Sequence, residues 1–184
     1  MGADKAFLRL GNLTLLEHAI GAVKKVCERV ALVGDRERLS PHGEVIEDKF
    51  SEQGPLAGIQ AALTSPSASE WNLMLAVDTP AISAEFLKYL FSEAQSSSET
   101  VTVPRANGHT QPLCAVYRRE FATVAEQSLR NGRRKIDPLF AEVPVRIIEE
   151  DELKAVGFLP DIFDNVNTPE DWQRMQRRRG AIPE

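Results

Sequence analysis

The chain has 184 residues, of which 42% are hydrophobic and 27% are charged, and its formal net charge at pH 7 is -5. These values are typical of one globular domain, and the negative charge argues against a general nucleic-acid binder, which usually carries a basic excess. Because the sequence has neither a run of about 20 apolar residues nor the charged and apolar regions of a signal peptide, we expect a single cytoplasmic domain, 1–184.

The first half of the chain alternates predicted helices and strands. Thr14 and Glu17 have the spacing of a capping box, and apolar residues then recur at helical spacing, which predicts a helix ending near residue 29. β-Branched residues predict short strands at 30–34 and 44–48. A Gly-Pro pair opens a further helix, because the fixed φ of proline suits the first helical turn. The apolar run 73–77 then predicts a strand buried on both faces of a parallel sheet.

The second half continues the alternation. The sequence predicts a helix over about 83–95, strands in TVTVP and PLCAVYR, and a helix over about 119–129. A short helix near 138–142, a strand in VRIIEE and a last helix starting at Thr168-Pro169-Glu170-Asp171 follow. We therefore expect an α/β fold with a mostly parallel sheet and helices on both faces. Ligands of such folds bind at the carboxyl ends of the strands.

Asp78 is the most informative single residue, because it directly follows a predicted buried strand. A carboxylate at this edge can hold Mg²⁺, which takes oxygen ligands and usually bridges to substrate phosphates. Alternatively, Asp78 only caps a turn before Pro80. The sequence alone leaves both readings open.

Two further stretches could bind a nucleotide. Lys5, after Gly2 and Asp4, could contact a phosphate, although a lysine near a chain end is usually only solvated. In GPLAGI, a glycine-flanked helix start offers backbone N–H groups to an anion, or is simply a tight junction. Asp48 could accept hydrogen bonds from a sugar or base, or cap a loop.

The loop RANGHTQ offers neutral hydrogen-bonding side chains. Asn107, His109 and Gln111 could contact a heterocycle, although an Asn-Gly turn between two strands needs no function. The sequence shows neither a nucleophile-elbow serine nor Cys and His at metal spacing. Covalent catalysis therefore has little support.

Several segments together resemble one family. MGADKAFLRLG, VIED before GPLAGI, LAVDTP, QPLCAVY and NVNTPEDW come in the order and approximate spacing of the molybdenum cofactor guanylyltransferases, the MobA family, over residues 1–172. The resemblance implies a Rossmann-like nucleotidyltransferase fold. It also implies transfer of GMP from Mg-GTP to the terminal phosphate of molybdopterin, with release of pyrophosphate, a reaction that needs positioned cations more than an acid–base pair.

The resemblance also implies roles for individual residues. Lys5 would contact phosphate and Asp78 would hold Mg²⁺, and both would be catalytic. The nucleotide-binding set would be Lys5, Asp35, Asp48, Gly54, Pro55, Leu56 and Asp78. The pterin-binding set would be Asn107, Gln111, Pro112, Asn165 and Asn167. At Asp35-Arg36 the chain departs from the family, which often has Asn-Arg there.

A larger departure is at the front. The family begins with a strand and a glycine-rich loop, L-A-G-G-x-S-x-R, which this sequence does not contain. Such a loop would supply backbone N–H groups to the triphosphate. We therefore expect the chain either to be incomplete relative to the functional protein or not to catalyse.

The expected partners are GTP and molybdopterin, with transient contact to molybdoenzymes or their chaperones and none to nucleic acid or membrane. Two alternatives stay open: a cytidylyltransferase of the same cofactor pathway, and a non-catalytic relative that binds a nucleotide or a partner protein. GPLAGI and the Asp-Lys pair favour guanine. A sugar-nucleotide pyrophosphorylase is disfavoured, because the short C-terminal half leaves little room for a sugar-binding subdomain.

Overall fold

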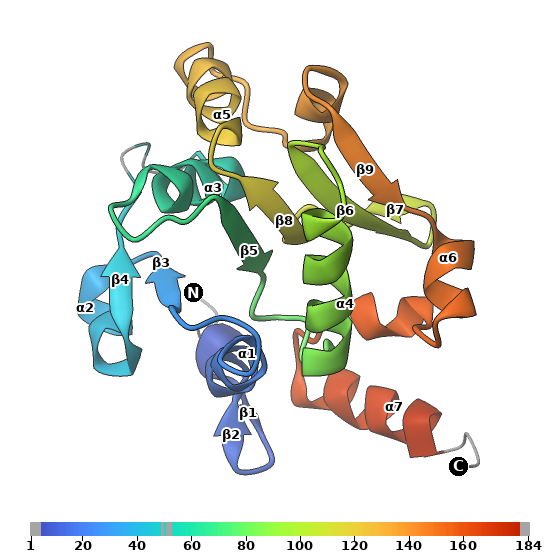
Figure 1. Cartoon of the computed structure of the whole chain (residues 1–184). Coiled ribbons are helices and arrows are strands. Elements are labelled where there is room, and N and C mark those ends of the chain that lie inside the picture. Colours follow the sequence, from blue (N-terminus) through green and yellow to red (C-terminus); the bar gives the residue numbers. More distant parts are fainter. Residues whose placement is uncertain (1–4, 49, 51–52, 181–184) are drawn as a thin grey trace.

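The computed structural model describes residues 5–48, 50 and 53–180, which form an α/β fold with helices on both sides of a central sheet (Figure 1). The helices are α1 (Leu15–Val23), α2 (Arg36–Leu39), α3 (Pro55–Thr64), α4 (Ala84–Gln95), α5 (Phe121–Arg130), α6 (Glu150–Ala155) and α7 (Pro169–Gly180). The strands are β1 (Arg9–Leu10), β2 (Leu13–Thr14), β3 (Ala31–Val33), β4 (Glu44–Ile46), β5 (Trp71–Leu75), β6 (Val101–Ala106), β7 (His109–Thr110), β8 (Cys114–Arg118) and β9 (Val145–Ile148). Short 3-10 helices cover Lys5–Phe7, Ser40–His42, Asp137–Ala141 and Pro160–Phe163.

The central sheet has the order β5-β8-β6-β7, with β9 also paired to β6. The α/β class is confirmed, but the sheet is mixed rather than mostly parallel. β8 runs antiparallel to β5 and β6, and β7 runs antiparallel to β6, whereas β9 is parallel to β6. The expectation was wrong because an apolar run is typical of parallel sheets but does not require one, and β5 is an edge strand that pairs antiparallel with β8. β3 and β4 form a separate parallel pair.

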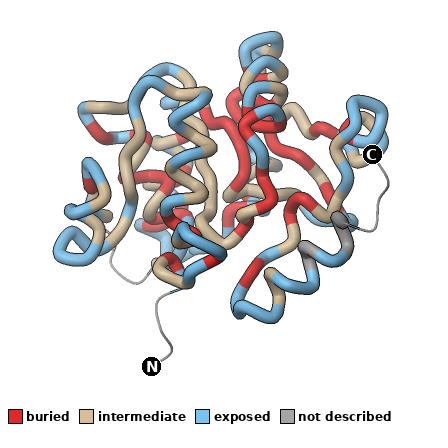
Figure 2. Tube along the Cα trace, turned by 90° about the horizontal axis from the view of Figure 1, so that it is seen from below, coloured by how far each residue is buried: buried red, intermediate tan, exposed pale blue. Residues whose placement is uncertain are grey.

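Each face of the sheet is covered by its own hydrophobic layer. On one face, α3 and α5 pack against the sheet through fully buried side chains that include Leu56, Tyr117 and Phe121. On the other face, α4 and α6 form a layer in which the rings of Phe86 and Phe163 meet edge to face at 5.3 Å. Figure 2 shows the buried segments gathered inside the molecule, with exposed segments around them. Burial of each large apolar side chain in this way contributes about 1.5–3 kcal/mol to the free energy of folding, relative to leaving it exposed.

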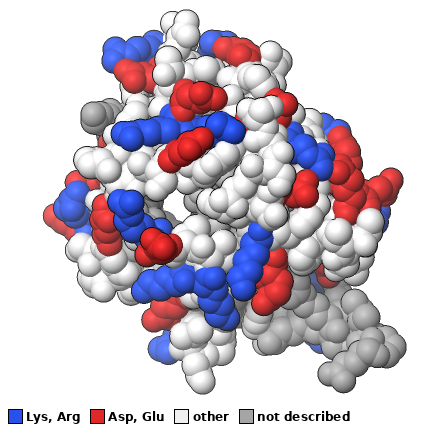
Figure 3. All heavy atoms as spheres, viewed as in Figure 1, with Lys and Arg blue, Asp and Glu red and all other residues white. Residues whose placement is uncertain are grey.

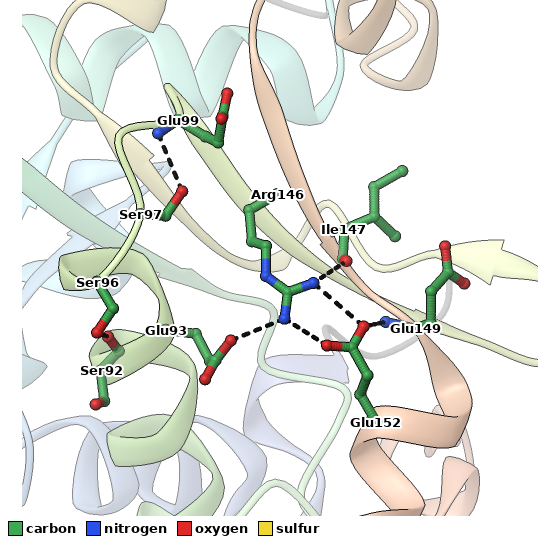
Figure 4. A network of polar contacts seen from close by, with 9 residues as sticks. All are labelled: Ser92, Glu93, Ser96, Ser97, Glu99, Arg146, Ile147, Glu149 and Glu152. Atoms are coloured by element: carbon green, nitrogen blue, oxygen red, sulfur yellow. Dashed lines mark hydrogen bonds and ion pairs between the residues drawn. The ribbon is translucent and has the colours of Figure 1, made fainter.

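A polar network joins α4 and α6 to the edge of the sheet (Figure 4). Arg146 on β9 donates to the carboxylates of Glu93, at 2.9 Å, and Glu152, at 2.5 Å. It also donates to the carbonyl oxygen of Ile147 at 2.6 Å. These carboxylates, Glu152 first, raise the pKa of the Arg146 guanidinium above its usual range. The network fixes two helices relative to β9.

Several boundaries differ from the sequence-based expectations. α1 begins with the predicted capping box of Thr14 and Glu17 but ends at Val23, after which single turns continue to Cys27. β5 lies two residues earlier than predicted, and all its side chains are only partly buried, because β5 is an edge strand of the sheet. α2 and α6 occupy polar segments with no apolar periodicity, so the sequence pattern did not indicate them.

No helix in the described part of the chain is both long and apolar enough to cross a membrane.

On the face seen in Figure 3, basic and acidic side chains lie next to each other in small groups. Ion pairs among the described residues include Arg118 with Glu70 and Arg105 with Glu149.

Candidate active site

Asp78 lies in a turn directly after β5, and backbone hydrogen bonds hold this turn from two sides. The N–H of Ala76 donates to the carbonyl of Leu113, and the carbonyl of Asp78 accepts from the N–H of Val166, both at 2.7 Å. The buried Thr79 donates its hydroxyl to the Ala76 carbonyl at 3.1 Å. The Asp78 carboxylate is partly exposed and has no hydrogen-bond or ion-pair partner among the described residues. It is therefore available to a cation, whereas no hydrogen bond supports the capping alternative.

The segment that binds this turn belongs to the C-terminal part of the chain. Val166 is fully buried in a small core with Leu10, Leu15 and Ala81. Asn165 and Asn167, on either side of Val166, are exposed. Burial of Val166 thus anchors the segment and leaves the two asparagine side chains at the surface beside the Asp78 turn.

The start of α7 fixes the backbone that follows Val166. The Asp171 carboxylate accepts hydrogen bonds from the N–H groups of Asn167, at 3.0 Å, and Thr168, at 2.9 Å. The Thr168 hydroxyl accepts in return from the Asp171 N–H at 3.1 Å, so the predicted helix start is confirmed. The hydrogen bond from the Asn167 backbone is the largest of several that hold the pKa of Asp171 below its usual value.

Lys5 joins this group from the other end of the chain. It begins the 3-10 helix Lys5–Phe7, is exposed, and donates from Nζ to the side-chain oxygen of Asn167 at 2.5 Å. Because Asn167 adjoins Val166, which binds the Asp78 carbonyl, the structure gathers Lys5, Asn167 and Asp78 in one surface region. Gly2 and Asp4, from the same stretch of sequence, lie outside the described residues.

Gln111 and Pro112 lie at the same edge of the sheet, because Leu113 binds the end of β5 two residues before Asp78. The Gln111 amide donates weakly to backbone carbonyls of its own hairpin, at 3.4 and 3.5 Å. The Pro112 carbonyl accepts from the Tyr117 hydroxyl at 2.8 Å. Asn107 is at the hairpin tip with φ 52°, and its N–H donates to Glu150 on α6 at 2.8 Å. Its contacts thus lead to α6 rather than to Lys5.

Asp35 and Asp48 follow β3 and β4, two strands that run in parallel with Val33 opposite Ile46. Extending this register by two residues brings Asp35 level with Asp48, so both carboxyl groups are at one edge. Asp35 accepts from the Arg38 N–H at 3.3 Å as the N-cap of α2. Asp48 is partly buried and has no partner among the described residues.

The GPLAGI stretch forms the start of α3. Gly54 is the N-cap residue with φ 74°, a backbone conformation that favours glycine, and Pro55 takes the first helical turn. Leu56 has no exposed surface and belongs to the core under α3. Its side chain therefore cannot contact a ligand, and only its backbone could.

A cavity of about 800 Å³ separates β3 from β5. Its walls are mainly apolar, with contributions from α1, β3 and β5. Its lining includes the charged residues Asp35 and Arg38, and it also touches Ala6 and Val77, which adjoin Lys5 and Asp78. Because a triphosphate requires polar partners, the charged groups that line this cavity are better suited to bind it than the apolar walls.

The donor set around Asp78 fits a Mg²⁺ ion that is completed by substrate. In the ranges that the structure describes, no group of three or more His, Cys, Asp or Glu side chains could hold a metal ion. Mg²⁺ commonly binds one or two carboxylates and takes its other ligands from water and substrate phosphates. A single unpaired carboxylate at Asp78 is compatible with such a site.

Comparisons with known proteins agree on one family. Residues 1–145 match the model of the MobA-like NTP transferase domain. A probable molybdenum cofactor guanylyltransferase from Pelotomaculum thermopropionicum is 35% identical over 173 residues, which cover 93% of this chain and 83% of the relative. A relative from Desulfosudis oleivorans, named molybdenum cofactor guanylyltransferase, is 32% identical over 95% of this chain and 87% of its own length.

A solved structure has the same fold. The crystal structure of molybdopterin-guanine dinucleotide biosynthesis protein A from Archaeoglobus fulgidus superposes with a TM-score of 0.81, at 25% identity, over 98% of this chain and 93% of the other. The sequence-based resemblance and the nucleotidyltransferase fold are thereby confirmed.

Proposed function

The chain belongs to the MobA-like NTP transferase family, and from this premise we propose that it transfers GMP from GTP to the terminal phosphate of molybdopterin. The products are molybdopterin guanine dinucleotide and pyrophosphate. The names of its relatives support the reaction, and the observation that carries the proposal is the gathering of Lys5, Asn167 and Asp78 at one edge of the sheet.

The reaction is a phosphoryl-group displacement. A phosphate oxygen of molybdopterin attacks the α-phosphorus of GTP, and the bond to the oxygen that bridges the α- and β-phosphates breaks. Such a displacement needs the reacting groups held in line and the phosphate charge balanced, and it needs little covalent help from the protein. Lys5 is assigned this electrostatic role, because its exposed ammonium binds Asn167, the neighbour of the residue that binds the Asp78 carbonyl.

Asp78 is the residue that would hold Mg²⁺. When bound there, the ion would balance negative charge on the substrate phosphates. The Asp78 carboxylate is partly exposed and has no partner within the described ranges, which supports this assignment.

The other proposed contacts divide between the two substrates. On the nucleotide side are Asp35 and Asp48, with Gly54, Pro55 and the backbone of Leu56 at the start of α3. On the pterin side are Asn165, Asn167, Gln111 and Pro112, which border the Asp78 turn, and Asn107 at the hairpin tip. We further propose that residues 1–184 form a single domain and that the protein is located in the cytoplasm. We also propose that it contacts molybdoenzymes or their chaperones transiently.

A product assay tests the function. The full-length protein is incubated with molybdopterin, Mg²⁺ and either GTP or CTP, and the dinucleotide and pyrophosphate are measured together. We expect equal amounts of guanine dinucleotide and pyrophosphate, and at least tenfold less product from CTP. A preference for CTP would assign the protein to cytidylyl transfer, and nucleotide binding without product from either would identify a non-catalytic binder.

A further inference from the structure

Lys5 is held by a neutral partner. Its ammonium donates to the amide oxygen of Asn167 at 2.5 Å, across 162 residues of sequence. An amide oxygen fixes the direction of the ammonium without cancelling its charge, whereas a carboxylate at that position would form an ion pair with it. The Lys5 ammonium is therefore directed by an amide and has no ion pair with a carboxylate among the described residues.

Asn167 depends in turn on Asp171. One carboxylate oxygen of Asp171 accepts both from the backbone N–H of Asn167 and from that of Thr168. Its other oxygen accepts from Arg174 one turn further along α7. The acidic group is thus engaged by backbone donors and an arginine, and its hydrogen-bonded connection to Lys5 runs through Asn167.

The beginning of α7 is itself fixed on the body of the protein. Trp172 packs against the small core that contains Leu10 and Leu15, and its ring lies 6.1 Å from that of His18 on α1. Together with the bond from Val166 to the Asp78 carbonyl, this packing gives the turn at Asn167 two firm supports. Asp171 closes the turn between these two supports by accepting hydrogen bonds from the N–H groups of Asn167 and Thr168.

We propose that Asp171 is a positioning residue for Lys5: it fixes the Asn167 backbone, so that the Asn167 amide holds the Lys5 ammonium where it meets substrate phosphate. The proposal rests on the phosphate-contacting role of Lys5 in the proposed function. It adds a link from α7 to the reacting groups that passes through two hydrogen-bonded steps, Asp171 to Asn167 and Asn167 to Lys5.

The variant Asp171→Ala tests the link, and Glu170→Ala is its matched control. Glu170 precedes Asp171 in the same first turn of α7, is exposed, and has no hydrogen bond or ion pair among the described residues. Both substitutions remove one negative charge near the helix N-terminus, so their effects on the helix dipole are similar. Only Asp171→Ala removes the bonds to Asn167 and Thr168.

The first readout is the reactivity of Lys5 and needs no substrate. Limited acetylation followed by mass spectrometry gives the rate at Lys5 relative to Lys154, whose ion pair with Glu150 on α6 serves as an internal reference. We expect Asp171→Ala and Asn167→Ala each to raise the relative rate at Lys5 at least threefold, the double variant to add nothing further, and Glu170→Ala to leave it unchanged.

The second readout is turnover. We expect Asp171→Ala to lower kcat by about tenfold or more, because small displacements of a reacting group are costly, with a smaller change in the KM for GTP. Asp171→Asn, which keeps an acceptor oxygen, should recover most of kcat. If Asp171→Ala fails to fold, Asp171→Asn and Asn167→Ala carry the same comparison.

The two readouts separate the proposals. An unchanged rate at Lys5 in Asp171→Ala, or an equal change in Glu170→Ala, would overturn the positioning role. The variants could show the expected acetylation rates at Lys5 while the wild-type protein transfers no guanylyl group. That result would refute the proposed function and leave the positioning of Lys5 by Asp171 standing.

Discussion

The ammonium of Lys5 donates a hydrogen bond to the side-chain oxygen of Asn167, which lies 162 residues further along the chain. This bond joins the first described residue to the segment before α7, which also binds the turn that carries Asp78. Sequence reasoning placed Lys5 on the nucleotide side of the site and Asn167 on the pterin side. Under the proposed function, this contact means that the nucleotide side and the pterin side of the site meet at Lys5.

Replacing Lys5 with methionine should remove the positive charge and keep a side chain of similar length. We expect kcat/KM for GTP to fall roughly 10²–10³-fold, as it does when one placed electrostatic donor is lost from an active site. The exposed lysine on α6 provides the control, Lys154→Met, which should change kcat/KM less than twofold. Equal losses in the two variants would show that general charge, rather than the place of Lys5, matters.

Asp78→Asn should abolish Mg²⁺-dependent turnover while the melting temperature stays within about 2 °C, since the Asp78 side chain has no partner among the described residues. The measurement is initial rate against Mg²⁺ concentration, alongside thermal unfolding. Asp151→Asn is the matched control, because that side chain is 98% exposed on α6. A normal Mg²⁺ response in Asp78→Asn would remove Asp78 from the metal site.

The local features of the fold could be predicted because their causes are local. Thr14 with Glu17 and Ser83 with Phe86 are cap contacts between residues three apart, so the sequence pattern is sufficient to indicate them. α6 escaped prediction because its six residues show no apolar stripe, although Glu149 and Glu152 form a capping box there. The direction of β8 also escaped prediction, because burial on both faces is typical of parallel strands, whereas the buried β8 runs antiparallel to β5 and β6.

The members of the proposed site, whose roles stay predictions, could be named from the sequence, but their arrangement could not be predicted. Lys5, Asp78 and Asn167 were each named from short stretches, whereas the Lys5–Asn167 bond depends on the packing of Val166 and Trp172 against the N-terminal segment. Asp171 was recognised only as part of a helix start. The positioning role that we propose for it rests on the three-dimensional position of Asn167, for which a single sequence contains no signal.

Arg146→Met should destabilise the protein without changing its chemistry. The substitution leaves the Glu93 and Glu152 carboxylates without their shared partner, with exposed side-chain fractions of 29% and 43%. Allowing for this exposure, we expect the free energy of unfolding to fall by about 1–2 kcal/mol, measured by urea denaturation. kcat at a temperature where the variant is folded should be unchanged.

Arg130→Met is the control for this loss. Arg130 pairs with Glu126 along α5, but its side chain is 69% exposed, so its removal should cost less than about 0.5 kcal/mol. A cost as large as that of Arg146→Met would show that arginine removal in general, and not the network of α4, β9 and α6, causes the loss.

The same network predicts a pH dependence. The Arg146 guanidinium, first through its hydrogen bond, lowers the pKa of Glu152 below its ordinary value of 4.5. A carboxyl whose pKa is lowered in the folded state stabilises the fold above that ordinary value and loses the effect as pH falls through the lowered pKa. The stability difference between wild type and Glu152→Gln should therefore be full at pH 6–7 and shrink below pH 4.5. A difference that grew on acidification would contradict this assignment.

The fate of the GTP phosphates tests the central claim most directly. The protein is given molybdopterin, Mg²⁺ and GTP labelled at either the α- or the γ-phosphate. Guanylyl transfer predicts that the α-label enters the pterin dinucleotide and that the γ-label leaves in pyrophosphate, one for one. A γ-label on the pterin, or no transfer of the α-label, would contradict the account.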